Sequence, residues 1–149
     1  MICVDQGKGK TISVADVLAV TDPRVRAFYI RFGWQTGREE FTVPTVDPLG
    51  DEEPDAGYFM NHSCDPTAVA FGKLYIAFRD IEPGEEITYD YATTETQFDR
   101  IPECKCGTAR CRGSITAEDW KLPELQYRYP PLAWATHVVM QMFGRFGNA

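Results

Sequence analysis

Three cysteines lie close together near the C-terminal end of the chain, at Cys104, Cys106 and Cys111. Thiols spaced as Cys-x-Cys-x4-Cys are more typical of metal ligation than of the disulfide framework of a small secreted domain. Three reduced cysteines this close without a metal would be unusual. A closed structural zinc site needs four ligands in a tetrahedron, so one must come from elsewhere. The spacing leaves that ligand open among Cys3, Cys64, His62 and His137.

The composition is that of one globular domain. The chain has 149 residues, of which 44% are hydrophobic, enough for a core that needs no disulfides. Its net charge of −7 argues against direct binding to nucleic acid and would suit a basic partner. No stretch approaches the ~20 apolar residues of a membrane span, and the first residues lack the apolar core of a signal peptide. We expect an intracellular protein without membrane insertion, and leave its oligomeric state open.

Helical signals stand at both ends of the chain. Residues 21–33 predict a helix that Thr21 or Asp22 caps, with Pro23 in its first turn and an apolar face that packs on a core. A second helix is expected from Pro131 to Gly144. Between them, residues 115–131 are rich in aromatics and prolines without clear periodicity, and we expect them to wrap the surface.

The middle of the chain predicts short strands joined by turns. A hairpin is expected from residues 67–71 and 73–79, with its tight turn at Gly72. Pro83 and Gly84 predict the next turn. Alternation resumes over residues 86–91, which would place Ile87, Tyr89 and Tyr91 on one face of a strand.

Taken singly, the polar and aromatic residues of this region have ordinary interpretations. Asn61-His62-Ser63 satisfies the glycosylation pattern, but without a signal peptide this acceptor would not meet the glycosylation machinery. A lone histidine such as His62 is more often structural than catalytic. Tyr89 and Tyr91 could be core aromatics of a strand.

Three motifs in order say more than each alone: NHSCDP at 61–66, RDIEPGEEITYDY at 79–91 and CKCGTARCRG at 104–113. Their order and spacing resemble the SET-domain lysine methyltransferases with a post-SET zinc segment. The resemblance implies a mainly β fold with a few helices (α+β), a β-clip of short sheets with a knot-like C-terminal threading. It implies a SET domain over residues 1–100, a post-SET zinc segment over 101–115, and an extension with a terminal helix over 116–149.

The resemblance also implies roles for individual residues. Asn61 and His62 would contact the adenosyl group of S-adenosylmethionine, and Cys64 would be the fourth zinc ligand beside the three clustered cysteines. Tyr91 matches the active-site tyrosine, which also lies against the cofactor. Tyr89 occupies the second catalytic position, where the family carries phenylalanine or tyrosine and where a hydroxyl favours monomethylation.

The N-terminal part departs from the family pattern. SET domains open with a Gly-x-Gly strand that lets the backbone approach the cofactor. Gly7 and Gly9 are the candidates here, but the following KTISV lacks the expected apolar run. Either the motif is degenerate, or residues 8–10 belong to the turn that follows it and the first strands are missing, which would remove part of the cofactor pocket.

The function that the resemblance implies is methyl transfer from S-adenosylmethionine to a lysine amine, with zinc as a structural metal. A histone tail or another basic peptide is the expected partner. The location would be the nucleus and chromatin in a eukaryote and the cytoplasm in a bacterium. The alternatives are a catalytically silent SET-like module that binds a lysine peptide or another protein, and an unrelated small zinc-binding domain.

Overall fold

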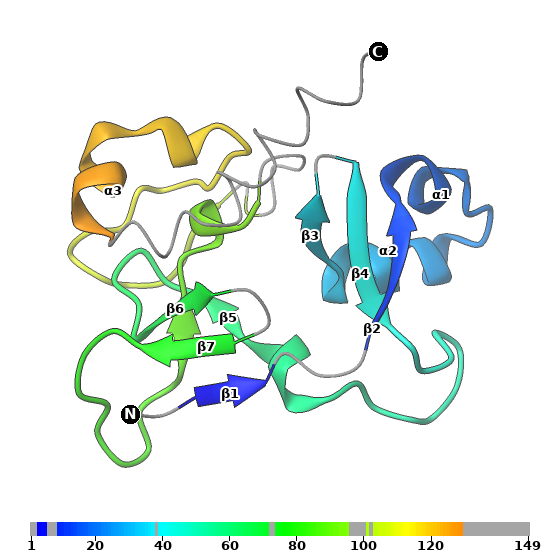
Figure 1. Ribbon diagram of the computed structural model, residues 1–149, viewed down its shortest axis with the longest axis horizontal. Helices are drawn as coiled ribbons and strands as arrows, with labels where there is room; N and C mark the ends of the chain where they lie inside the picture. The colour runs from blue at the N-terminus through cyan, green and yellow to red at the C-terminus, as the bar shows by residue number, and fades with distance from the viewer. Residues whose placement is uncertain are drawn as a thin grey trace.

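The structure is a computed structural model that describes residues 3–5, 9–37, 39–71, 74–95, 101 and 103–129. It is a mixed α+β fold of short elements (Figure 1). The strands are β1 (Cys3–Asp5), β2 (Gly9–Ser13), β3 (Trp34–Gly37), β4 (Glu40–Pro44), β5 (Asn61–His62), β6 (Ala68–Phe71), β7 (Leu74–Ala77) and β8 (Thr88–Tyr89). The helices are α1 (Val14–Ala19), α2 (Pro23–Phe32) and α3 (Pro123–Arg128), with 3-10 turns η1 (Ala56–Phe59), η2 (Tyr91–Thr93) and η3 (Asp119–Lys121). The expected fold of short sheets is confirmed.

The described strands form three small sheets. Two are antiparallel and have the orders β1-β7-β6 and β2-β4-β3. The third joins β5 and β8 in parallel, pairing Asn61 with Thr88 and His62 with Tyr89. This pairing brings the NHSC and ITYDY motifs side by side although they are far apart in the sequence. The knot-like threading of the C-terminal part stays a prediction.

The helix expected over 21–33 is present as α2, beside the β2-β4-β3 sheet (Figure 1). Asp22 is the cap, because its side chain accepts the Arg24 backbone N–H at 2.8 Å, and proline occupies the first turn. The helix packs less deeply than expected. None of its residues is fully buried, and its aromatic face reaches η1 through a ring contact of 5.4 Å between Phe32 and Phe59.

The two strands of the predicted hairpin are confirmed as β6 and β7, whose register pairs Phe71 with Leu74, while the predicted turn at Gly72 lies outside the described residues. Strand β6 is buried on both faces, because alternate side chains enter different clusters. Val69 packs with Ala92 and with Leu125 of α3, while Ala68 and Ala70 pack with tyrosines of β7 and β8. The predicted turn at Pro83-Gly84 is also present, and Gly84 has the positive φ of 86° that favours glycine there.

Two predictions need correction. Tyr91 does not continue the strand of Tyr89, because the Asp90 side chain accepts the Ala92 N–H and starts η2 instead. The segment after the cysteines does not merely wrap the surface. It forms η3 and α3, and Leu125 is only 3% exposed within the core. Helix α3 is six residues long, too short to show a helical period in the sequence.

The helix expected over 131–144 lies outside the described residues. Within the part of the chain that the structure describes, no helix is both long and apolar enough to cross a membrane.

Candidate active site and metal centre

The parallel pair of β5 and β8 stands at the wall of a cavity of about 700 Å³. That volume is in the range of small-molecule sites. Residues from four regions of the sequence line it, among them Arg31, Asn61, His62, Glu86, Tyr91 and Cys104. The cavity therefore brings together three of the residues predicted to contact the cofactor, Asn61, His62 and Tyr91, and two of the predicted zinc ligands, Cys104 and Cys106.

His62 connects the cavity wall with the cysteines. The Tyr91 backbone N–H donates to its Nδ1 at 3.2 Å, so that nitrogen carries no proton and the hydrogen belongs on Nε2. Nε2 lies 3.3 Å from the Cys64 sulfur, where it can donate to a thiolate. Burial lowers the pKa of His62 to about 4, although the nearby Asp90 acts in the opposite direction. A neutral imidazole thus joins the two predicted motifs.

Tyr91 is held at two points. Besides its N–H bond to His62, its hydroxyl donates to the Met60 carbonyl at 3.0 Å. Its ring is the end of a row in which the Tyr75, Tyr89 and Tyr91 centroids follow one another at 4.9 Å each. Tyr89 is 6% exposed within this row. The two predicted catalytic tyrosines are therefore in contact, although they are not on one strand.

Asn61 faces a carboxylate. Its Nδ2 donates to Glu86 Oε1 at 2.6 Å, which turns the amide oxygen away from Glu86. Asn61 pairs with Thr88 in the parallel register, and Glu86 lies two residues before Thr88 in the sequence. Glu86 was not singled out from the sequence, because only the pairing of β5 with β8 places it beside Asn61.

The four cysteines of the prediction meet in one cluster. The sulfurs of Cys64, Cys104, Cys106 and Cys111 all lie within 4.8 Å of one another. Cys64 and Cys104 are 3.9 Å apart, far longer than a disulfide of about 2.05 Å. A tetrahedral zinc with bonds of about 2.3 Å would place its sulfurs about 3.8 Å apart. The cluster is therefore consistent with a post-SET zinc site.

The buried Cys64 thiol favours its neutral form unless a cation is bound nearby. Burial raises the pKa of Cys64 to about 12, although its bond from the Arg112 N–H lowers it in part. As a free thiol it would thus stay protonated, and a bound zinc would favour the thiolate. Of the alternatives for the fourth position, His62 contacts Cys64 instead, and His137 lies outside the described residues.

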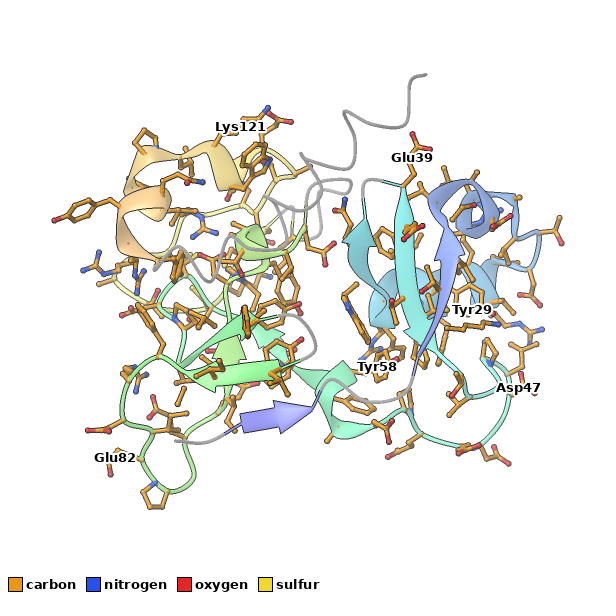
Figure 2. The ribbon with its side chains drawn as sticks, in the orientation of Figure 1. Tyr29, Glu39, Asp47, Tyr58, Glu82 and Lys121 are labelled. Atoms are coloured by element: carbon orange, nitrogen blue, oxygen red, sulfur yellow. The ribbon has the colours of Figure 1, made fainter. Side chains whose placement is uncertain are left out.

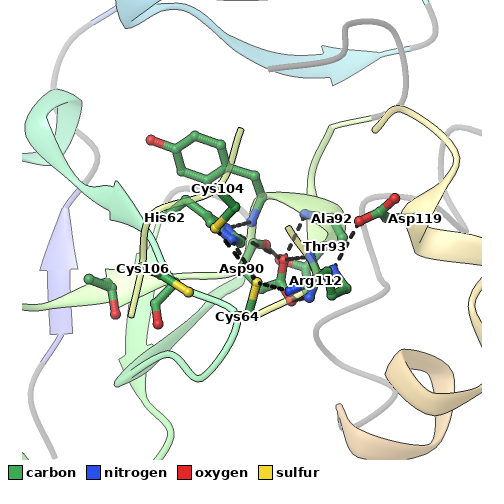
Figure 3. A network of polar contacts seen from close by, with 12 residues as sticks. His62, Cys64, Asp90, Ala92, Thr93, Cys104, Cys106, Arg112 and Asp119 are labelled. Carbon is green, nitrogen blue, oxygen red and sulfur yellow. Dashed lines mark hydrogen bonds and ion pairs between the residues drawn. The ribbon is translucent and has the colours of Figure 1, made fainter. Parts of the chain in front are cut away.

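A buried polar network joins this cluster to the active-site motif, and sequence reasoning missed it (Figure 3). Its centre is the ion pair of Arg112 with Asp90, at 2.7 and 2.8 Å. Arg112 also donates to Asp119 at 2.9 Å, and the Tyr129 hydroxyl donates to Asp90 at 2.9 Å. The motifs CRG and YDY contain the two central residues, but nothing in their spacing indicates that they pair.

The predicted glycine pair is only half described. Gly7 lies outside the described residues, and Gly9 opens β2. A Cβ on Gly9 would approach the Tyr58 hydroxyl to 2.6 Å and the Val43 carbonyl to 3.0 Å, so the close packing of β4 and η1 requires glycine there. Figure 2 shows Tyr58 beside the end of this sheet. A cofactor contact of Gly7 and Gly9 stays a prediction.

Comparison with known proteins decides the family. The SET domain family model matches residues 6–92, more than half of the chain. The chain belongs to the SET domain family. SET domains use S-adenosylmethionine. Of the four clustered cysteines, Cys64 lies within the SET-domain match and the other three follow it, as in members with a post-SET zinc segment.

Its curated relatives include fungal histone-lysine N-methyltransferases. An H3 lysine-9 specific enzyme of Neurospora crassa is 31% identical over 109 residues, covering 52% of this chain and 33% of that protein. An H3 lysine-9 specific enzyme of Schizosaccharomyces pombe is 33% identical over 84 residues, covering 40% and 17%. An H3 lysine-4 specific enzyme of the same yeast is 49% identical over 65 residues, covering 38% and 7%. The chain therefore spans a third or less of the length of these relatives.

Proposed function

We propose that this chain is a protein lysine N-methyltransferase that uses S-adenosylmethionine and acts on a basic peptide. The observation that carries the proposal is the meeting of Asn61, His62 and Tyr91 on one cavity, inside a SET domain. The same cavity reaches the four-cysteine cluster at Cys104 and Cys106. Names of the relatives support the reaction type, because they are histone-lysine N-methyltransferases.

The lining of the cavity suits S-adenosylmethionine, which carries charges of both signs. Glu86 supplies a carboxylate, while Arg31 and Lys105 supply cations. Asn61 and His62 would hold the adenosyl part, with the Asn61 amide oxygen available as an acceptor. When bound, this cofactor supplies a methyl group on a cationic sulfonium that a neutral amine can attack.

The tyrosines would prepare the lysine for this reaction. A lysine amine has a pKa of about 10.4 in water and must lose its proton before it can attack. An apolar aromatic channel disfavours the ammonium form and so lowers that pKa. Tyr91 would orient the amine, since both its N–H and its hydroxyl are anchored in place. The Tyr89 hydroxyl would limit the space for added methyl groups and favour monomethylation.

The cysteine cluster would hold a structural zinc. Four thiolates leave no open position on a tetrahedral ion, so its role is to fix the chain rather than to take part in the reaction. The zinc would tie the segment at 101–115 to the SET domain at 1–100, with residues 116–149 as an extension. Cys64 supplies the ligand that lies before this segment in the sequence.

A histone tail is the substrate class we propose. The net charge of −7 suits a basic partner, and the exposed loop at 47–55 carries five carboxylates, at Asp47, Asp51, Glu52, Glu53 and Asp55. According to their names, the relatives are specific for lysines of histone H3. In a eukaryote this activity would place the protein in the nucleus.

Cofactor binding tests the proposal before a substrate is known. Calorimetric titration with S-adenosylmethionine should give binding by the wild-type protein and about two- to tenfold weaker binding by Asn61→Ala, since a hydrogen bond between neutral groups is worth roughly 0.5–1.5 kcal/mol. Gln126→Ala removes an exposed amide of α3 and should leave the affinity unchanged. A zinc-loaded wild-type protein without cofactor binding would instead support a silent SET-like module.

A further inference from the structure

Asp90 stands between the two proposed catalytic tyrosines in the sequence and is only 1% exposed. Its carboxylate accepts bonds from three directions. The Arg112 guanidinium donates at 2.7 and 2.8 Å, the Tyr129 hydroxyl at 2.9 Å and the Ala92 N–H at 3.1 Å. The last of these bonds caps η2, whose first residue is Tyr91, and so helps to fix the backbone of Tyr91. The position of this carboxylate therefore bears on the position of Tyr91.

The strongest of these partners comes from the cysteine segment. Arg112 follows Cys111 directly, and its own backbone N–H lies 3.4 Å from the Cys64 sulfur as a donor. One residue thus contacts a sulfur of the proposed zinc cluster with its backbone and Asp90 with its side chain (Figure 3). His62 makes a parallel connection, from the same sulfur to the Tyr91 N–H.

The charges in this network make Arg112 difficult to replace. The side chains of Arg112, Asp90 and Asp119 are 10%, 0% and 11% exposed, so solvent screens them little. His62 Nδ1 lies 3.7 Å from Asp90, but it accepts the Tyr91 N–H and so has no proton to donate to the carboxylate. Without the guanidinium, the Asp90 carboxylate would keep only neutral donors, and the chain at 90–93 would be driven to shift toward water.

We propose that Arg112 is a positioning residue for the active site, which transmits the order of the metal-bound cysteine segment through Asp90 to Tyr91. The inference rests on the proposed function, because it assigns Tyr91 to the reaction. A shift of Tyr91 by about 1 Å would misplace the amine and lower kcat about 100-fold. Arg112, which does not line the cavity, would thereby affect catalysis without touching the reacting atoms.

The test compares two arginine-to-methionine variants. Arg112→Met removes the pair with Asp90, whereas Arg128→Met removes a guanidinium that reaches the Cys64 carbonyl at 2.6 Å and Asp65 but not Asp90. Both should retain one zinc per chain. Arg112→Met should lose about 100-fold in kcat with little change in KM for the cofactor, while Arg128→Met should keep wild-type kcat. Arg112→Lys, which keeps the charge with fewer donors, should recover part of the loss.

A second readout does not depend on methyl transfer. Hydrogen exchange at the Tyr91 amide, which bonds to His62, should be at least about tenfold faster in Arg112→Met and unchanged in Arg128→Met. If Arg112→Met does not fold, the same comparison is made with Arg112→Lys. An unchanged Tyr91 amide and unchanged kcat in a zinc-loaded Arg112 variant would overturn the inference. Absence of methyl transfer by the wild type would refute the proposed function alone, since the exchange measurement still decides the coupling.

Discussion

Replacement of Cys64 by serine tests the proposed zinc centre at its most buried ligand. Cys64 is 1% exposed and lies in the loop after β5, whereas the other three cysteines come from residues 104–111. It is therefore the ligand that would fasten the cysteine segment to the SET domain. Cys64→Ser keeps the size of the side chain and removes the thiolate.

The expected loss of zinc affinity follows if the four ligands contribute equally to the free energy of zinc binding. Structural zinc binds Cys and His sites with about 10–16 kcal/mol at neutral pH, or roughly 3 kcal/mol for each of four ligands. Loss of one ligand should weaken zinc binding about 100-fold. If the same roughly 3 kcal/mol is lost from the free energy of unfolding, Tm should fall by about 6–12 °C for a domain of this size.

Competition with a chromogenic chelator measures the zinc affinity, and thermal unfolding measures the fall in Tm. Cys3→Ser is the matched control, because four cysteines already complete a tetrahedral site and the fifth cysteine belongs to β1. Zinc affinity within about threefold of wild type in Cys64→Ser, or a loss in Cys3→Ser instead, would refute the assignment of ligands.

Three further predictions address the tyrosine row, the glycine of β2 and a surface ion pair. Tyr89→Phe should shift the product toward dimethyl-lysine in mass spectra, whereas Tyr75→Phe, at the far end of the row, should not. Gly9→Ala should lower the free energy of unfolding in urea by about 1–3 kcal/mol, because its Cβ would be overpacked. Hydrogen bonding to Arg79 lowers the pKa of Glu85 to about 2, so the pair stabilises the protein above the ordinary value of 4.5 and this contribution is lost as the pH falls toward 2. In Arg79→Gln, NMR titration should find the Glu85 pKa shifted back toward 4.5.

Local patterns predicted much of the fold, because they report interactions between neighbours in the sequence. Asp22 and Pro23 begin α2, and the hairpin of β6 and β7 follows from alternation about a glycine. The cysteine cluster was predicted from spacing, but its fourth ligand was not, since Cys64 lies 40 residues before Cys104. Only the resemblance to SET domains selected it.

What the sequence did not predict depends on contacts between distant residues. Arg112 and Asp90 are 22 residues apart, and Tyr129 is 39 residues from Asp90. No periodicity indicates such pairs, which exist only because the fold brings three segments to one buried point. The end of β8 could have been foreseen, because aspartate is a preferred cap and Asp90 stands where η2 begins.

Methyl transfer from labelled S-adenosylmethionine to histones and basic peptides, by the wild type and by Tyr91→Phe, tests the central proposal most directly. The variant loses the hydroxyl that donates to the Met60 carbonyl and keeps the ring. We predict transfer by the wild type and a loss of about 100-fold in the variant, with cofactor binding retained. Equal transfer by both would contradict the role of Tyr91, and no transfer by the zinc-loaded wild type would contradict the proposed activity.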